Sequence, residues 1–210
     1  MNKYITSDYV VSALANLPQL VFEVTDACNL RCKYCAYGEF YEDYDCRENK
    51  MLSTEKAIRL IDYLAEYWNS NLNTSADKNI TISFYGGEPL LNFPFIEAVV
   101  KHIKNNVHCP HRRFSFSMTT NAILLHKYMD FLQENNFHLL VSLDGNKEND
   151  GYRMDKAGHS SFERVVTNVD MLRDKYPDYF LRYVNFNAVL HNRNSVESIY
   201  RFFKEKYNKI

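Results

Sequence analysis

The 210-residue sequence predicts a single α/β domain whose parallel sheet curls into a barrel or a segment of one. Short apolar runs rich in β-forming residues alternate with longer stretches whose apolar residues recur at helical spacing. No internal repeat, low-complexity tract or Gly/Ser-rich linker interrupts this alternation. In addition, the residue types that carry chemistry follow the predicted strands, and ligands of parallel α/β folds bind at the carboxyl ends of strands.

A polar and aromatic lead-in, residues 1–18, precedes the predicted core domain, residues 19–210. The first strand is a short apolar run that we expect to lie in a mostly buried sheet. The five predicted strands cover residues 20–24, 80–84, 114–118, 138–143 and about 183–189.

Five predicted helices follow these strands. Ser53 precedes the first as a predicted N-cap, and Ser160-x-x-Glu163 and Asn194-x-x-Glu197 have the capping-box pattern at the last two. Each helix has one apolar face. These faces comprise Ile58, Ile61, Ala65 and Trp68; Ile96, Val99, Val100 and Ile103; Leu125, Tyr128 and Leu132; Phe162, Val165, Val166 and Val169; and Val196, Ile199, Tyr200 and Phe203.

Composition excludes several classes of protein. The chain is 46% hydrophobic, enough for a sizeable core, and its net charge of -1 argues against a nucleic-acid-binding surface. No run approaches the ~18 apolar residues of a membrane span. The N-terminus lacks the pattern of a signal peptide, and an odd number of cysteines, five, indicates the reducing cytoplasm.

Cys28, Cys32 and Cys35 form a C-x3-C-x2-C motif directly after the first predicted strand. Thiolates select iron–sulfur clusters, zinc or Cu(I), and three of them can hold a cubane while leaving one iron open. A structural zinc site normally takes four ligands, often as two spaced pairs, and no second pair lies at a matching spacing nearby. The stretch resembles the signature of the radical S-adenosylmethionine (SAM) enzymes.

This resemblance implies a [4Fe-4S] cluster held by the three cysteines, with SAM bound to the open iron. It also implies a partial parallel (β/α) barrel of the radical SAM type, with about five of the family's six units present. Tyr34 corresponds to an aromatic residue that lies against the adenine of SAM, although an ordinary packed tyrosine remains an alternative.

Gly86-Gly87-Glu88-Pro89 follows the second predicted strand and matches the family's GGEP motif. Two glycines let the backbone approach a ligand closely, and the resemblance implies that this turn binds the methionyl ammonium of SAM. Two other interpretations remain open: a simple turn, and a loop that Glu88 fixes in place.

The later strand ends carry further candidates. Residues 119–121, Thr-Thr-Asn, resemble a segment that lines the top of the barrel, but Asn121 also suits a helix cap. Ser142 and Asp144 lie on the same face by strand alternation. The resemblance makes Ser142 a SAM contact and Asp144 a polar group near the reacting centre, our candidate catalytic residue.

Arg153 lies where relatives place an arginine against the SAM carboxylate, a pairing that a bidentate guanidinium suits. Without the motif, a surface arginine is the simpler interpretation. Asn187, near the end of the fifth strand, is the remaining candidate SAM contact. A solvated strand face would also explain it.

Three features carry less information. The aromatic and acidic segment 37–45 forms either a packed surface loop or a shield over the cluster. We interpret Cys46 as a free thiol, because a fourth ligand would close the open iron. Cys109, within His108-Cys109-Pro110-His111, belongs to a cluster of metal-capable residue types that we interpret as incidental.

The pairing of GGEP with Ser142-Leu143-Asp144-Gly145 resembles the SPASM-type branch of the family that modifies peptides and proteins. It implies reductive cleavage of SAM to a 5′-deoxyadenosyl radical, which abstracts hydrogen from a peptide substrate. We favour a ribosomal-peptide maturase, with an anaerobic sulfatase-maturating enzyme as the alternative. A flavodoxin or ferredoxin would supply the electron.

Only five of six units are predicted, and no cysteine-rich C-terminal region follows them, so we expect a fragment or a truncated gene product. Two interpretations outside catalysis stay open: a non-catalytic module that binds a cluster or a peptide, and a zinc-binding structural domain.

Overall fold

The computed structural model describes residues 4–37, 47–75 and 77–209. Its centre is one five-stranded sheet in which every neighbouring pair is parallel and the strand order follows the sequence. The strands are β1 (Gln19–Thr25), β2 (Asn79–Gly86), β3 (Arg113–Thr120), β4 (His138–Ser142) and β5 (Val184–Asn187). The predicted α/β fold with a parallel sheet is therefore confirmed.

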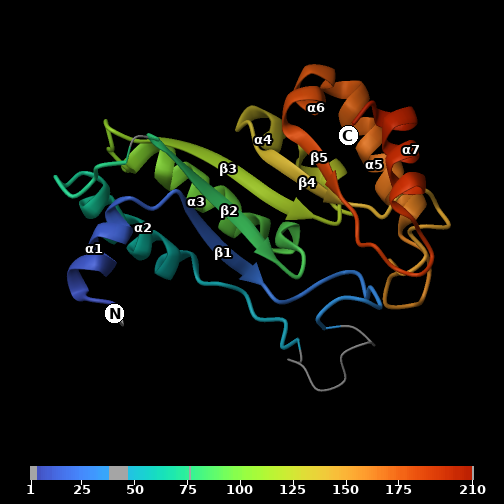
Figure 1. Cartoon of the computed structure of the whole chain (residues 1–210), viewed down its shortest axis with the longest axis horizontal. Coiled ribbons are helices and arrows are strands. Elements are labelled where there is room, and N and C mark those ends of the chain that lie inside the picture. Colours follow the sequence, from blue (N-terminus) through green and yellow to red (C-terminus); the bar gives the residue numbers. More distant parts are fainter. Residues whose placement is uncertain (1–3, 38–46, 76, 210) are drawn as a thin grey trace.

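Helices cover one face of this sheet (Figure 1). They are α1 (Ser7–Ala15), α2 (Thr54–Trp68), α3 (Phe93–Asn106), α4 (Leu125–Glu134), α5 (Phe162–Lys175), α6 (Pro177–Tyr183) and α7 (Val196–Tyr207), with a short 3-10 helix, η1 (Pro89–Asn92). Apolar side chains of α2 to α7 and of the strands form one continuous core between the two layers. Among the described residues, no helix combines the length and apolar character that a membrane span requires.

The sheet has two different faces, which we call outer and inner. On the outer face, beneath the helices, alternate strand residues such as Phe22, Ile82 and Phe116 are buried. On the inner face, Val21 is 54% and Tyr85 56% exposed. The expectation of a mostly buried sheet was therefore wrong for the inner face, because no helix of the described chain covers it.

Helix caps agree with the sequence only in part. Ser53 caps α2, accepting a hydrogen bond from the Lys56 N–H as predicted. The capping box at Ser160 is wrong, because Ser161 is the N-cap of α5 and makes no side-chain cap bond. The prediction of a capping box at Asn194 is also wrong. Its side chain bonds within the preceding turn, and the box forms one residue later, between Ser195 and Ser198.

Two short helices, α1 and α6, were not predicted. Helix α1 lies within the lead-in, and α6 places Pro177 in its first turn, directly before β5. As a result, β5 begins at Val184 and ends at Asn187, a shorter strand than residues 183–189. The carboxyl end of β5 therefore lies at Asn187 itself, two residues earlier than predicted, and Asn187 still lines the cavity.

Candidate active site

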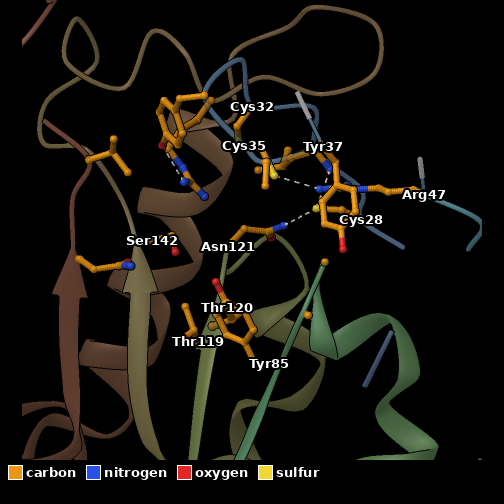
Figure 2. A pocket seen from close by; sticks show the side chains of 18 of the residues that line it. Cys28, Cys32, Cys35, Tyr37, Arg47, Tyr85, Thr119, Thr120, Asn121 and Ser142 are labelled. Carbon is orange, nitrogen blue, oxygen red and sulfur yellow. Dashed lines mark hydrogen bonds between the residues drawn. The ribbon is translucent and has the colours of Figure 1, made fainter. Parts of the chain in front are cut away.

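A cavity of about 430 Å³ opens at the carboxyl ends of the strands. Its lining comes from β1, β2, β3, β4 and β5 and from the loops that follow them (Figure 2). The structure brings most of the predicted site residues together there: Cys28, Cys32, Tyr34, Cys35, Gly86, Gly87, Ser142, Asp144, Arg153 and Asn187. Glu88 and Pro89 do not line it.

The cysteine loop is fixed by backbone pairing with a distant segment. The N–H of Arg31 donates to the carbonyl of Met154 at 2.7 Å, and that of Lys33 to the carbonyl of Tyr152 at 3.1 Å. Both bonds join the loop after β1 to the connection between β4 and α5. The fold therefore holds the cysteines in place by contacts 119 or more residues away in sequence, counted from 33 to 152.

All three thiols line this cavity and are free. N–H groups are directed at two of them, since the Leu30 N–H lies 3.4 Å from Cys28 Sγ and Arg47 Nη2 lies 3.2 Å from Cys35 Sγ. Burial raises the pKa of the Cys32 thiol to about 11, opposed by the nearby charge of Arg153.

Within the described residues, no three His, Cys, Asp or Glu side chains converge closely enough to hold one metal ion. A cubane makes a different demand, because each thiolate binds a different iron at the corner of a bulky cluster. Three cysteines around one cavity, with N–H donors directed at the sulfurs of Cys28 and Cys35, fit such a cluster.

Gly86, the last residue of β2, and Gly87 contact the end of β1 and the residues just before Cys28. The Gly87 N–H donates to the Thr25 carbonyl at 2.7 Å, and the Glu88 N–H donates to the Ala27 carbonyl at 2.8 Å. A Cβ atom at Gly87 would lie 2.1 Å from the Ala27 oxygen, and Gly86 has a φ of +129°. Only glycine therefore allows this close approach of the two backbones.

Glu88 is completely buried and bonded away from the cavity. Its carboxylate accepts hydrogen bonds from the Thr120 hydroxyl at 2.8 Å, the Asn121 N–H at 2.7 Å and the Leu90 N–H at 3.1 Å. Burial raises its pKa, although these hydrogen bonds act in the opposite direction. This geometry favours the interpretation that Glu88 fixes the loop, by joining the ends of β2 and β3.

Thr119, Thr120 and Asn121 line the cavity, as the resemblance implied. Asn121 is not the N-cap of α4, where Leu124 stands without a side-chain bond. Its Oδ1 accepts from the Ile123 N–H at 3.0 Å, and its Nδ2 lies 2.8 Å from Asn29 Oδ1 and 3.6 Å from Cys28 Sγ. Asn121 therefore supports the cysteine loop from the end of β3.

A buried polar network forms the opposite side of the cavity. The Tyr34 hydroxyl donates to Asp144 Oδ2 at 2.6 Å and accepts from Arg153 Nη1 at 3.0 Å. Asp144 Oδ1 also accepts from the Val189 N–H at 2.9 Å. The Tyr34 ring stacks on His191, with centroids 6.0 Å apart. Burial raises the pKa of Tyr34, so this hydroxyl keeps its proton.

Arg153 and Asp150 complete the network. Arg153 Nε lies 3.6 Å from Asp150 Oδ1, and both side chains are almost fully buried. Burial lowers the pKa of the guanidinium, but nearby acidic groups, Cys32 first among them, raise it further, so it stays charged. Burial raises the pKa of Asp150 to about 7, and the neighbouring Asp144 carboxylate adds to this increase.

Several cavity residues were not predicted from the sequence. Glu23 and Tyr85 line it from the inner face, and strand alternation could have identified both, since they share a face with Val21 and Ser83. Arg47, which lines the cavity, follows no recognisable pattern, and neither does Asp150, which lies behind the lining beside Arg153. Cys46 and most of segment 37–45 lie outside the described residues, and Cys109 is a buried free thiol before the amino end of β3.

Comparisons with known proteins agree with this architecture. A cysteine-type anaerobic sulfatase-maturating enzyme of Clostridium novyi (strain NT) is 33% identical over 201 residues, 92% of this chain and 49% of the relative. The radical SAM cyclopropyl synthase TigE of Paramaledivibacter caminithermalis is 28% identical over 80% of this chain and 34% of the relative. The chain thus spans half the length of these curated relatives or less.

Among solved structures, native anSMEcpe with bound AdoMet, which is SAM, has a TM-score of 0.74 at 25% identity. The alignment covers 90% of this chain and 49% of that one. The five-stranded parallel sheet is consistent with the partial barrel that the sequence predicted. The model of the Radical SAM superfamily matches residues 22–204. The chain therefore belongs to the radical SAM superfamily, whose members use a [4Fe-4S] cluster and SAM.

Proposed function

We propose that this chain is the catalytic core of an enzyme that reductively cleaves SAM and abstracts hydrogen from a peptide. The observation that carries the proposal is the shared cavity: Cys28, Cys32 and Cys35 face the same space as the strand-end residues predicted to bind SAM. A cavity of about 430 Å³ is within the range of sites for small molecules and cofactors.

The three thiolates would hold the cluster. A bound cluster would supply the one electron for reductive cleavage of the S–C5′ bond of SAM, which would give methionine and a 5′-deoxyadenosyl radical able to take a hydrogen atom from the substrate. The chain supplies position and protection for this chemistry. The backbone at Gly86 and Gly87 would bind the methionyl ammonium, and Arg153 would bind its carboxylate.

Ser142 and Asn187 would bind the rest of SAM from the ends of β4 and β5, and Tyr34 would lie against the adenine. Glu88 and Pro89 act on SAM indirectly in this proposal, by fixing the turn that contains the glycines. Asp144 would be the polar group next to the reacting centre, oriented by the Val189 N–H and the Tyr34 hydroxyl.

For the substrate we propose a ribosomally made peptide that this enzyme matures. Similarity to a solved structure of anSMEcpe with bound AdoMet and Cp18Cys peptide supports a peptide substrate. Similarity to sulfatase-maturating enzymes keeps a sulfatase as the alternative substrate. A flavodoxin or a ferredoxin would donate the electron, and we propose the cytoplasm as the compartment.

The test is production of 5′-deoxyadenosine. The protein is reconstituted anaerobically with iron and sulfide, then given dithionite and SAM, beside a Cys32→Ala variant. The proposal predicts product from the parent and none from the variant. A parent protein that binds the cluster but forms no product would favour the non-catalytic module, and a colourless protein with bound zinc would contradict the proposal.

A further inference from the structure

Arg47 carries a positive charge to the cluster site from a part of the sequence without any motif. Its Nη2 donates to Cys35 Sγ at 3.2 Å, and its guanidinium lies over the Tyr37 ring, 4.8 Å from the ring centroid. Figure 2 shows Arg47 and Tyr37 beside Cys28 and Cys35 at the edge of the cavity. The side chain thus has an aromatic ring on one side and a sulfur at its tip.

Two arginines line this cavity, and their partners differ. Arg153, near Cys32, bonds to the Tyr34 hydroxyl and lies beside the Asp150 carboxylate, which balances its charge. Among described residues, no carboxylate lies within ion-pair distance of Arg47, and its buried Nε has no hydrogen-bond partner. The positive charge of Arg47 is therefore less neutralised than that of Arg153, and it would attract a negatively charged group in the cavity more strongly.

Among the described residues, the other N–H donors directed at the thiols are neutral. They are the Leu30 N–H and the Asn121 amide, both directed at Cys28. A charged donor gives a stronger and shorter hydrogen bond than a neutral one, and the Arg47 guanidinium bonds to Cys35 and also lies close to Cys28. Hydrogen bonds to cluster sulfurs and the local net charge are among the factors that set the reduction potential of an iron–sulfur cluster.

We propose that Arg47 is a positioning residue that raises the reduction potential of the cluster through its hydrogen bond to the Cys35 sulfur. Reduction adds one electron to the cluster, from a low-potential protein donor or from dithionite, and makes the cluster more negative by one charge. A fixed cation at a ligating sulfur stabilises that reduced state over the oxidised state. The proposal rests on the proposed function, because it requires a cluster on the three cysteines.

The test is a redox titration of the reconstituted protein without SAM, followed by electron paramagnetic resonance of the reduced cluster. We expect Arg47→Met to lower the equilibrium constant for reduction about tenfold, which corresponds to 59 mV for one electron. Arg47→Lys keeps the charge but not the planar guanidinium, so its potential should lie between those of the parent and Arg47→Met.

Arg31→Met is the matched control. It removes the same charge from the same cysteine loop, but Arg31 is exposed and does not line the cavity, so solvent screens it. Its potential should equal that of the parent. An Arg47→Met potential equal to that of the parent, or an equally large shift in Arg31→Met, would overturn the proposal.

Iron content, measured on every variant, separates this inference from the proposed function. A parent protein without iron contradicts the proposed function itself, whereas a loaded parent with an unshifted Arg47→Met contradicts only the role of Arg47. If Arg47→Met binds too little iron for a redox titration, the reduction potential of Arg47→Gln is measured in its place, because glutamine removes the charge but keeps a neutral N–H donor. A lowered potential in Arg47→Gln supports the proposal, and an unchanged one overturns it.

Discussion

The outer and inner faces of the sheet differ in chemistry, although neighbouring residues of the same strands form them. Phe84, on the outer face of β2, is 1% exposed, and its ring centroid lies 5.7 Å from that of Phe137. Ser83, the preceding residue, faces the other side and shares a 2.6 Å hydrogen bond with Ser117 of β3. The outer face supplies the apolar packing that holds the fold together. The inner face is thereby left to polar groups and to the cavity.

The largest effect should come from breaking the outer face. Phe84→Ala removes a ring that also contacts Phe22 and Phe95, and leaves a cavity in the core. We expect the free energy of unfolding to fall by about 3–5 kcal/mol. Urea unfolding followed by circular dichroism measures it, and a loss of less than about 1 kcal/mol would contradict the assignment of the outer face as the core.

Among the substitutions, the second largest effect concerns the buried carboxylate of Glu88, which joins the ends of β2 and β3. Glu88→Gln replaces one acceptor oxygen by an NH₂ group that would face the N–H of Asn121. We expect a loss of about 2 kcal/mol in the free energy of unfolding, typical of a buried bond to a charged group. The same urea experiment tests it. An unchanged midpoint would show that the loop does not depend on Glu88.

The free energy of unfolding should depend on pH through the buried polar network, which contains titratable groups, and not through the apolar core. The folded pKa of Asp150, about 7, lies above the value of about 3.9 for an unfolded chain, so the folded state binds more protons between them. The free energy of unfolding should therefore fall as pH rises from about 4 to 7, by up to about 1.4 kcal/mol per pH unit, and level off above pH 7.

Asp150→Asn isolates this contribution from that of other titrating groups, including Asp144 and Arg153, which face the same carboxylate. The uncharged amide resembles the protonated acid, so the fall should be absent from the variant. Unfolding curves of both proteins at several pH values give the difference. Parallel pH profiles for parent and variant would be inconsistent with a raised pKa.

The smallest effect should follow a change on the inner face. Ser83→Ala is the matched partner of Phe84→Ala, one residue away on the opposite side of β2. It removes hydrogen bonds to Ser117 and Gln19, which can bond to water at this face. We expect a loss of about 1 kcal/mol or less. If Ser83→Ala lowered the free energy of unfolding as much as Phe84→Ala, the two faces of the sheet would contribute equally to stability, contrary to this prediction.

The sequence was sufficient for the order of elements and for most of the cavity lining. Short β-forming runs that alternate with stretches of helical spacing predicted all five strands. Cys28, Gly86 and Asn187 were correctly placed at the carboxyl ends of their strands. Parallel topology explains this success, because it brings all carboxyl ends to one edge of the sheet, whatever the details of each helix.

The sequence was insufficient where a contact depends on distant backbone. The two glycines were assigned to a ligand, but the structure shows that they first permit contact with the carbonyls of Thr25 and Ala27. Ser160 and Asn194 had the pattern of a cap, but each helix has its N-cap one residue later, at Ser161 and Ser195, and the Asn194 side chain bonds within the preceding turn instead. Arg47, twelve residues beyond Cys35, reaches its sulfur only through the folded path of the chain.

The most direct test of the account is whether SAM reaches the open iron of the cluster. Electron paramagnetic resonance spectra of the reduced, reconstituted protein are recorded before and after SAM is added. We expect a cluster signal whose g values shift with SAM, because three cysteines would bind three irons and leave the fourth without a protein ligand. A cluster signal that SAM does not change would contradict the central claim that the same cavity binds both the cluster and SAM.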